Sequence, residues 1–127
     1  MARLHDIVFD AAHPASIARF WADALEGYAV APYDEAELER LRAFGIHDPE
    51  DDPTVLVESR NGGPRLWFQR VPEPKRVKNR VHLDLAVGDP ELEIERLTLL
   101  GATVLNRQNG LTLLADPEGN EFCVSLG

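Results

Sequence analysis

The sequence predicts an α+β fold in which two βαβββ modules form a curved mixed sheet with a central cleft. Residues 5–69 read as a strand, a helix and three strands, and residues 80–125 repeat that order. Local matches accompany the repeat: A-A-H-P and V-G-D-P precede the two helices, and L-E-G-Y-A-V and L-L-G-A-T-V follow them. Repetition of a whole unit indicates a duplicated architecture. We expect a single domain over residues 1–127, with 70–79 as a linker.

Composition narrows the class of protein. Of the 127 residues, 44% are hydrophobic and 28% are charged, as in a soluble globular domain. The formal net charge of −9 disfavours nucleic-acid binding, which needs a basic surface. No run approaches the roughly 18 apolar residues of a membrane span. The N-terminus lacks the apolar core of a signal peptide, and a single cysteine excludes an internal disulfide. These features predict a cytoplasmic protein without nucleic-acid or membrane partners.

The first module is predicted to open with a strand over residues 5–11 and a helix over 14–26. Alternation gives the strand an apolar face and a largely polar one, namely Ile7 and Phe9 against Asp6, Val8 and Asp10. Pro14 suits the first turn of the helix, and Gly27 is expected to end it. Apolar residues form a stripe at helical spacing: Ile17, Phe20, Trp21, Ala24 and Leu25.

A strand over 28–33 is followed by a segment, 34–52, that has no counterpart in the second module. Its first part predicts a short helix ended by Gly45, with three apolar residues inward: Leu38, Leu41 and Phe44. Eight acids and two bases give the segment −6 of the chain's −9. A solvated surface insertion is the simpler interpretation. A lid over a pocket is the alternative, because long loops on compact domains are often functional.

Two strands, 54–59 and 65–69, complete the first module. Asn61-Gly62-Gly63 joins them as a hairpin, because these residues tolerate positive φ. Residues 70–80 then hold five bases, one acid and two prolines, which predicts an ordered linker with a charge of +4.

The second module opens with a strand over 80–89. One face is uniformly aliphatic and is expected to be buried: Val81, Leu83, Leu85 and Val87. The other face carries His82, Asp84 and Ala86, and imidazole is the commonest metal ligand and proton shuttle.

The rest of the second module repeats the first without an insertion. A helix over 90–100, ended by Gly101, carries Leu92, Ile94, Leu97, Leu99 and Leu100. The remaining elements are a hairpin of 103–108 with 111–115 across Asn109-Gly110, a tight turn at 116–119 and a strand over 120–125.

The repeat pairs particular residues of the two modules. Aligning Pro14 with Pro90 gives an offset of 76, which places Asp6 opposite His82. Aligning Gly63 with Gly119 gives an offset of 56, which places Trp67 opposite Cys123. Two modules related by a local twofold axis would bring these four positions around one cleft.

Five stretches then carry a resemblance to a known family. They are F-W at 20–21, G-G-P-R-L-W-F-Q-R-V-P-E-P-K at 62–75, V-K-N-R-V-H-L-D-L at 77–85, L-G-A-T-V-L at 100–105 and A-D-P-E-G-N-E-F-C-V at 115–124. With the paired βαβββ pattern, they resemble the vicinal-oxygen-chelate superfamily of glyoxalase I, fosfomycin-resistance transferases, extradiol dioxygenases and bleomycin-resistance proteins. More narrowly, the chain is similar to the glyoxalase-like domains of actinobacteria. Only 34–52 lies outside the likeness.

The resemblance implies metal ligands, commonly His, Glu or Gln, on the first and last strands of each module. On this sequence those positions hold Asp6, Trp67, His82 and Cys123. His82 matches the pattern, whereas Trp67 cannot ligate a metal. We therefore favour a cleft without a metal. The alternative is a nickel, manganese, zinc or iron ion held by His5 or Asp6, His82 and Glu121.

In a cleft without metal, His82 would act as a general base or hydrogen-bond donor, with Asp84 or Glu121 orienting its imidazole. The plainer alternative is that these groups make structural hydrogen bonds. Trp67 would supply an apolar wall for a ring-bearing ligand. The expected ligand-binding residues are Asp6, Trp67, Gln69 and Cys123, although Cys123 also fits a small buried filler.

Two functions remain open from this resemblance, beside the plainer option of a domain whose role is to pair with another protein. One is the binding of an apolar or ring-bearing organic molecule without chemistry. The other is a lyase or isomerase of the glyoxalase-like kind that uses His82 with an acidic partner, with or without a metal. The resemblance also implies a homodimer, in which the acidic segment 34–52 and the basic segment 70–80 would meet.

Overall fold

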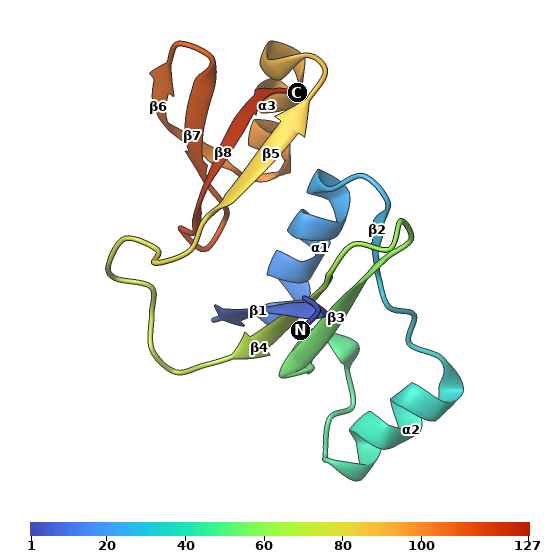
Figure 1. Cartoon of the computed structure of the whole chain (residues 1–127). Helices are drawn as coiled ribbons and strands as arrows, with labels where there is room; N and C mark the ends of the chain where they lie inside the picture. The colour runs from blue at the N-terminus through green and yellow to red at the C-terminus, as the bar shows by residue number, and fades with distance from the viewer. The chain divides into compact units, whose positions relative to one another are not determined.

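The computed structural model describes all 127 residues and divides into two compact units. Unit 1 is Met1–Pro74 and unit 2 is Lys75–Gly127, so the boundary falls within the predicted linker. Each unit contains one four-stranded sheet (Figure 1). No helix of either unit combines the length and the apolar content needed to cross a bilayer.

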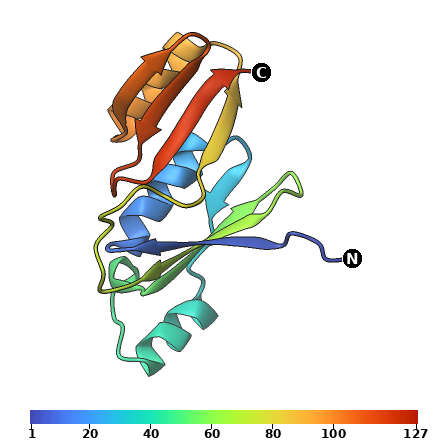
Figure 2. The same ribbon diagram turned by 60° about the vertical axis from the view of Figure 1, so that its left-hand side comes forward.

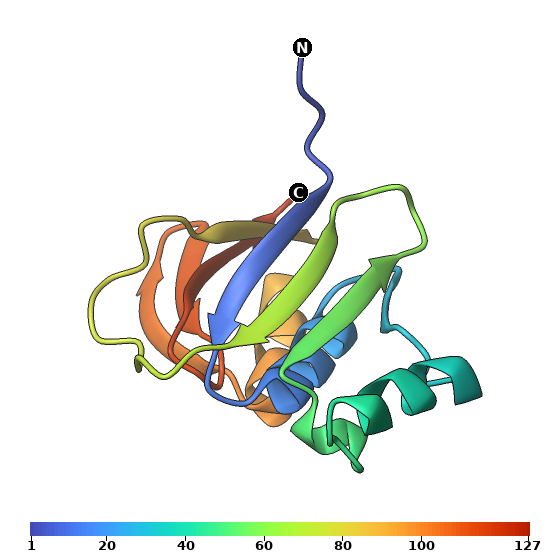
Figure 3. The same ribbon diagram turned by 90° about the horizontal axis from the view of Figure 1, so that it is seen from below.

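Unit 1 builds its sheet in the order β1-β4-β3-β2, with β1 and β4 parallel and the other pairs antiparallel. Its elements are β1 (Asp6–Ala11), α1 (Pro14–Ala24), β2 (Tyr28–Val30), α2 (Glu35–Ala43), the 3-10 helix η1 (Pro49–Asp51), β3 (Thr54–Ser59) and β4 (Arg65–Arg70). Helix α1 packs along one face of the sheet, as Figure 3 shows. Phe9 stacks on Phe68 at 4.9 Å between ring centroids and lies 5.8 Å from Trp21, which centres the core under α1.

Unit 2 repeats this topology in the order β5-β8-β7-β6, again with one parallel pair, β5 and β8. Its elements are β5 (Leu83–Val87), α3 (Pro90–Leu100), β6 (Thr103–Gln108), β7 (Leu111–Ala115) and β8 (Glu121–Leu126). Helix α3 covers one sheet face (Figure 2) and buries Ile94 and Leu97. The predicted tight turn forms because Asp116 accepts hydrogen bonds from the backbone N–H groups of Glu118 and Asn120, both at 2.9 Å.

The strand registers confirm the predicted duplication. Val8 pairs with Trp67 in unit 1, and Asp84 pairs with Cys123 in unit 2. The pairs differ by 76 on the first strand and by 56 on the last, which are the offsets that the sequence alignment gave. The mixed sheet is therefore present as two matching four-stranded sheets, one for each βαβββ module.

Several element ends and buried faces differ from the prediction. Helix α1 ends at Ala24, two residues early, and Gly27 adopts its positive φ beyond it, where a Cβ would meet the Asn61 amide at 2.2 Å. Strand β2 stops at Val30 rather than at Tyr33. The side chain of Tyr33 instead donates to the Asp52 carboxylate at 2.8 Å, because the chain turns into the insertion there.

The expected inward positions of two helices and one strand were partly wrong. In α2 only Leu41 is buried, and Phe44 is 72% exposed because it lies past the last helical residue. Val81 is exposed because the ladder between β5 and β8 begins only at Leu83. Leu92 and Leu99 are exposed because residues seven apart lie on the side of α3 opposite to Ile94 and Leu97.

Candidate functional site

The sheet face of unit 1 that α1 leaves open carries an apolar row. Trp67 on β4 is paired with Val8 on β1 and with Leu56 on β3, so the three side chains lie side by side. Val8 is 54% exposed, and Trp67 and Leu56 are half-buried. The sequence placed Val8 and Trp67 on this face, and the strand register adds Leu56.

Trp67 is held in place by an ion pair beside it. Arg65 donates from Nε and an Nη to the two oxygens of Asp6, at 2.8 and 3.0 Å. The indole Nε1 of Trp67 donates to the same carboxylate at 3.1 Å, and the Arg65 guanidinium lies 5.7 Å from the indole ring centre. The hydrogen bond from Arg65 lowers the pKa of Asp6, so this carboxylate is ionised at neutral pH. Both of its oxygens accept hydrogen bonds from Arg65.

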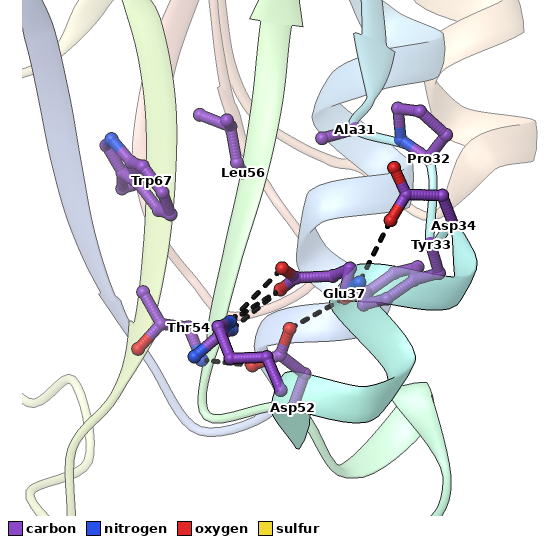
Figure 4. Close-up of a pocket in the computed structure, with 10 residues that line it drawn as sticks. Ala31, Pro32, Tyr33, Asp34, Glu37, Asp52, Thr54, Leu56 and Trp67 are labelled. Carbon is purple, nitrogen blue, oxygen red and sulfur yellow. Dashed lines mark hydrogen bonds and ion pairs between the residues drawn. The ribbon is translucent and has the colours of Figure 1, made fainter. Parts of the chain in front are cut away.

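A pocket of about 500 Å³ opens between this face and the acidic segment 34–52 (Figure 4). Trp67 and Leu56 lie on one side of it, and Ala31 and Pro32 lie on the other. Its remaining lining is polar: Tyr33, Asp34, Glu37, Arg40, Asp52 and Thr54. The acidic segment thus contributes Asp34, Glu37, Arg40 and Asp52 to the pocket lining, and its action as a lid stays a prediction.

The polar end of the pocket is built from two sets of contacts. Arg40 donates from Nε and an Nη to the Glu37 carboxylate, at 2.6 to 3.2 Å. Asp52, only 2% exposed, accepts from the Tyr33 hydroxyl at 2.8 Å and from the Thr54 backbone N–H at 3.0 Å. Figure 4 shows Glu37 and Asp52 at the same end of the pocket.

The pKa shifts at this end follow from the contacts. The hydrogen bond from Arg40 lowers the pKa of Glu37 below its usual range, so Glu37 is charged at neutral pH. Burial, followed by the hydrogen bond to Asp52, raises the pKa of Tyr33, so its hydroxyl stays protonated and remains a donor.

Unit 2 gathers three predicted residues: Asp84 on β5, Cys123 on β8, and His82, which comes directly before β5 rather than within the strand predicted over 80–89. The His82 Nε2 lies 3.2 Å from the Asp84 Oδ1, and Asp84 is paired in register with Cys123. The possible ligand atoms of the three lie within 4.8 Å of one another. Burial and the neighbouring Asp84 charge raise the pKa of the Cys123 thiol, so the thiol is protonated at neutral pH.

The other predicted site residues make separate contacts. Glu121 accepts from Lys75 Nζ and from the Asn79 backbone N–H, each at 2.8 Å, and it is not part of the cluster around His82. Gln69 donates to Asp10 at 2.8 Å and does not line the pocket. The Nδ1 atom of His5 lies 3.2 Å from an oxygen of Asp6, so His5 is a further neighbour of the carboxylate that Arg65 binds.

The metal centre that the resemblance implied does not fit these contacts. In unit 1, Asp6 is neutralised by Arg65, and Trp67 offers no ligand atom. In the alternative set, Glu121 is likewise paired with Lys75. Unit 2 retains His82, Asp84 and Cys123 as a group of three possible ligands, with the thiol protonated. The meeting of the four predicted positions in one cleft stays a prediction.

Sequence reasoning missed most of the pocket lining. The sequence places Tyr33 at the end of a strand, and it leaves Glu37, Arg40 and Asp52 in a segment that is either a surface insertion or a lid, without naming any of them as a site residue. One available signal was Leu56, because alternation in T-V-L-V-E-S puts this leucine on the face opposite Val55 and Val57.

A family model described as a glyoxalase-like domain matches residues 6–125. A search of curated proteins gave no match.

Among solved structures, the chain is similar to the fosfomycin resistance protein FosX from Mesorhizobium loti, with a TM-score of 0.68, 12% identity, and coverage of 100% of this chain and 93% of that one. A glyoxalase/bleomycin resistance/dioxygenase family enzyme from Burkholderia phytofirmans has a TM-score of 0.64 and 15% sequence identity, with 98% of each chain covered. The trypanothione-dependent glyoxalase I of Leishmania major has a TM-score of 0.62 and 13% sequence identity, and the match covers 99% of this chain and 87% of that one. At these identities the likeness shows the fold.

Proposed function

Because the chain belongs to the glyoxalase-like domain family, whose model spans residues 6–125, we propose that it binds a small organic molecule through an apolar or ring-shaped part, without needing a metal. The pocket beside Trp67 carries this proposal. Its volume of about 500 Å³ lies within the range of small-molecule sites. The orienting hydrogen bond from Trp67 to Asp6 fixes the indole before any ligand arrives, which lowers the entropic cost of binding.

The test is a thermal-shift screen of ring-bearing compounds, with titration calorimetry of the hits. Trp67→Leu removes the aromatic wall and should weaken binding about tenfold or more, whereas Trp67→Phe keeps a ring and should retain most of the affinity. Leu99→Ala is the matched control, because Leu99 is an exposed apolar residue of unit 2. Equal binding by wild type and Trp67→Leu would refute the assignment of the pocket.

A second candidate function rests on the pair of His82 and Asp84. An exposed imidazole 3.2 Å from a carboxylate is the arrangement of an oriented general base. The alternative is therefore a lyase or isomerase of the glyoxalase-like kind, in which His82 moves the proton and Asp84 orients the ring. Loss of turnover in His82→Ala with an unchanged melting temperature would support this enzyme, and loss of stability alone would indicate a structural histidine.

Metal dependence is tested apart from activity. The proposal expects no stoichiometric binding of nickel, manganese, zinc or iron(II) when the protein is titrated with each ion. Stoichiometric binding that disappears in both His82→Ala and Cys123→Ser would overturn the proposal of a metal-independent site and place the ion at the cluster of unit 2.

A further inference from the structure

The lining of the pocket has an unbalanced charge. Three carboxylates line it (Asp34, Glu37 and Asp52), and Arg40 is the only base among the lining residues. Arg40 is engaged by Glu37 through three contacts between 2.6 and 3.2 Å. With these groups ionised, the lining has a formal charge of −2.

Asp52 contributes a buried part of this charge. Asp52 is 2% exposed, and its carboxylate accepts hydrogen bonds from two neutral donors, the Tyr33 hydroxyl and the Thr54 backbone N–H. Neutral donors stabilise a carboxylate but leave its negative potential in the surrounding space. The field of a charge held in a partly enclosed space is screened less than that of a charge on an open surface.

The aromatic residues of the pocket also favour a positively charged ligand. Tyr33 and Trp67 both line the pocket, and the faces of aromatic rings attract cations. Arg65, which lies 5.7 Å from the Trp67 ring centre, is not among the residues that line the pocket. Its positive charge is moreover neutralised by Asp6, at 2.8 Å.

We propose that the ligand of this pocket is a ring-bearing compound with a positively charged amino or amidino group, the ring lying against Trp67 and Leu56 and the cation near Glu37 and Asp52. This inference rests on the proposed function and specifies the chemical class of its ligand. An anionic ligand would have to bind Arg40 in competition with Glu37 and beside two further carboxylates. A neutral ring compound would gain the apolar wall alone.

Three matched probes test the charge. They share a naphthalene ring and a two-carbon arm: 2-(1-naphthyl)ethylamine, 2-(1-naphthyl)ethanol and 1-naphthaleneacetate. Titration calorimetry at low salt should show the amine binding at least about fivefold tighter than the alcohol, and the carboxylate binding weakest. This preference should shrink as salt is raised.

Two variants of α2 locate the effect. Glu37→Gln removes one lining carboxylate and should cut the preference for the amine over the alcohol by about half or more. Glu39→Gln makes the same change in net charge on the same helix, but Glu39 does not line the pocket, so the preference should stay at the wild-type value. Circular dichroism and melting temperatures establish that both variants are folded.

The outcomes separate this inference from the proposed function. Equal binding of all three probes, lost in Trp67→Leu, would overturn the cationic ligand while leaving the ring-binding pocket intact. Tightest binding of the carboxylate, or an equal loss in Glu37→Gln and Glu39→Gln, would also overturn it. Binding of none of the probes to the folded wild-type protein would count against the pocket itself.

Discussion

Equivalent positions of the two modules hold residues that make different contacts. Asp6 and His82 correspond through the offset of 76, yet Asp6 is bound by Arg65 and Trp67 whereas His82 contacts only the exposed Asp84 among the ion pairs. The position that corresponds to Arg65 through the offset of 56 is Glu121, which pairs with Lys75. Duplication therefore preserved the backbone register while the chemistry of each module diverged.

The contacts of Asp6 predict an acid-sensitive contribution to stability. The Arg65 hydrogen bond lowers the pKa of Asp6 in the folded state, so its stabilising effect is present above the unfolded pKa of about 3.9 and is lost as the pH falls through the folded value. Urea unfolding from about pH 5 to about pH 3 should show a shallower loss of stability in Asp6→Asn than in wild type. Asp10→Asn, on the same strand face with the neutral partner Gln69, should follow the wild-type curve more closely. Parallel curves for Asp6→Asn and wild type would contradict this role.

At the scale of elements, the insertion is held by a few contacts along its length. Asp34 caps α2 by accepting from the Glu37 backbone N–H at 2.9 Å. Leu41 is the one buried residue of α2, and Arg19 of α1 pairs with Glu50 of η1 at 2.7 and 2.8 Å. Because these contacts position one wall of the pocket, weakening them should affect binding as well as stability.

The contrast between Leu41 and Phe44 tests which apolar residue anchors α2. Leu41→Ala should lower the free energy of unfolding by about 2–5 kcal/mol, the usual cost of emptying a buried leucine site. Phe44→Ala should change it by less than about 0.5 kcal/mol, because the ring is 72% exposed. Urea unfolding measures both values. A loss in Phe44→Ala as large as that in Leu41→Ala would mean that both side chains pack inward, as the sequence pattern predicts, and would contradict the exposed position of Phe44.

At the scale of the whole molecule, the sequence predicted what repetition and alternation determine. Both offsets, and with them the pairing of Val8 with Trp67 and of Asp84 with Cys123, could be derived from two aligned prolines and two aligned glycines. The pocket could not be derived in this way. Its acidic wall comes from 34–52, which has no counterpart in the second module, and its placement depends on tertiary contacts such as that between Tyr33 and Asp52.

At the same scale, the distribution of charge along the chain predicts a homodimer that is held partly by contact between two oppositely charged segments. The acidic segment 34–52 has a charge of −6 and the basic segment 70–80 has +4, and Arg76 in the latter is exposed. Contact between these segments of two copies would be screened by salt, so the dimer dissociation constant should rise between about 50 mM and about 500 mM NaCl. Arg76→Glu should weaken the dimer at low salt, and Arg3→Glu, an equal change outside the basic segment, should not. Analytical ultracentrifugation measures both. A dimer dissociation constant that stays the same as salt is raised would exclude this pairing of charged segments. Such a dimer would be held by buried apolar surface, which salt screening does not weaken.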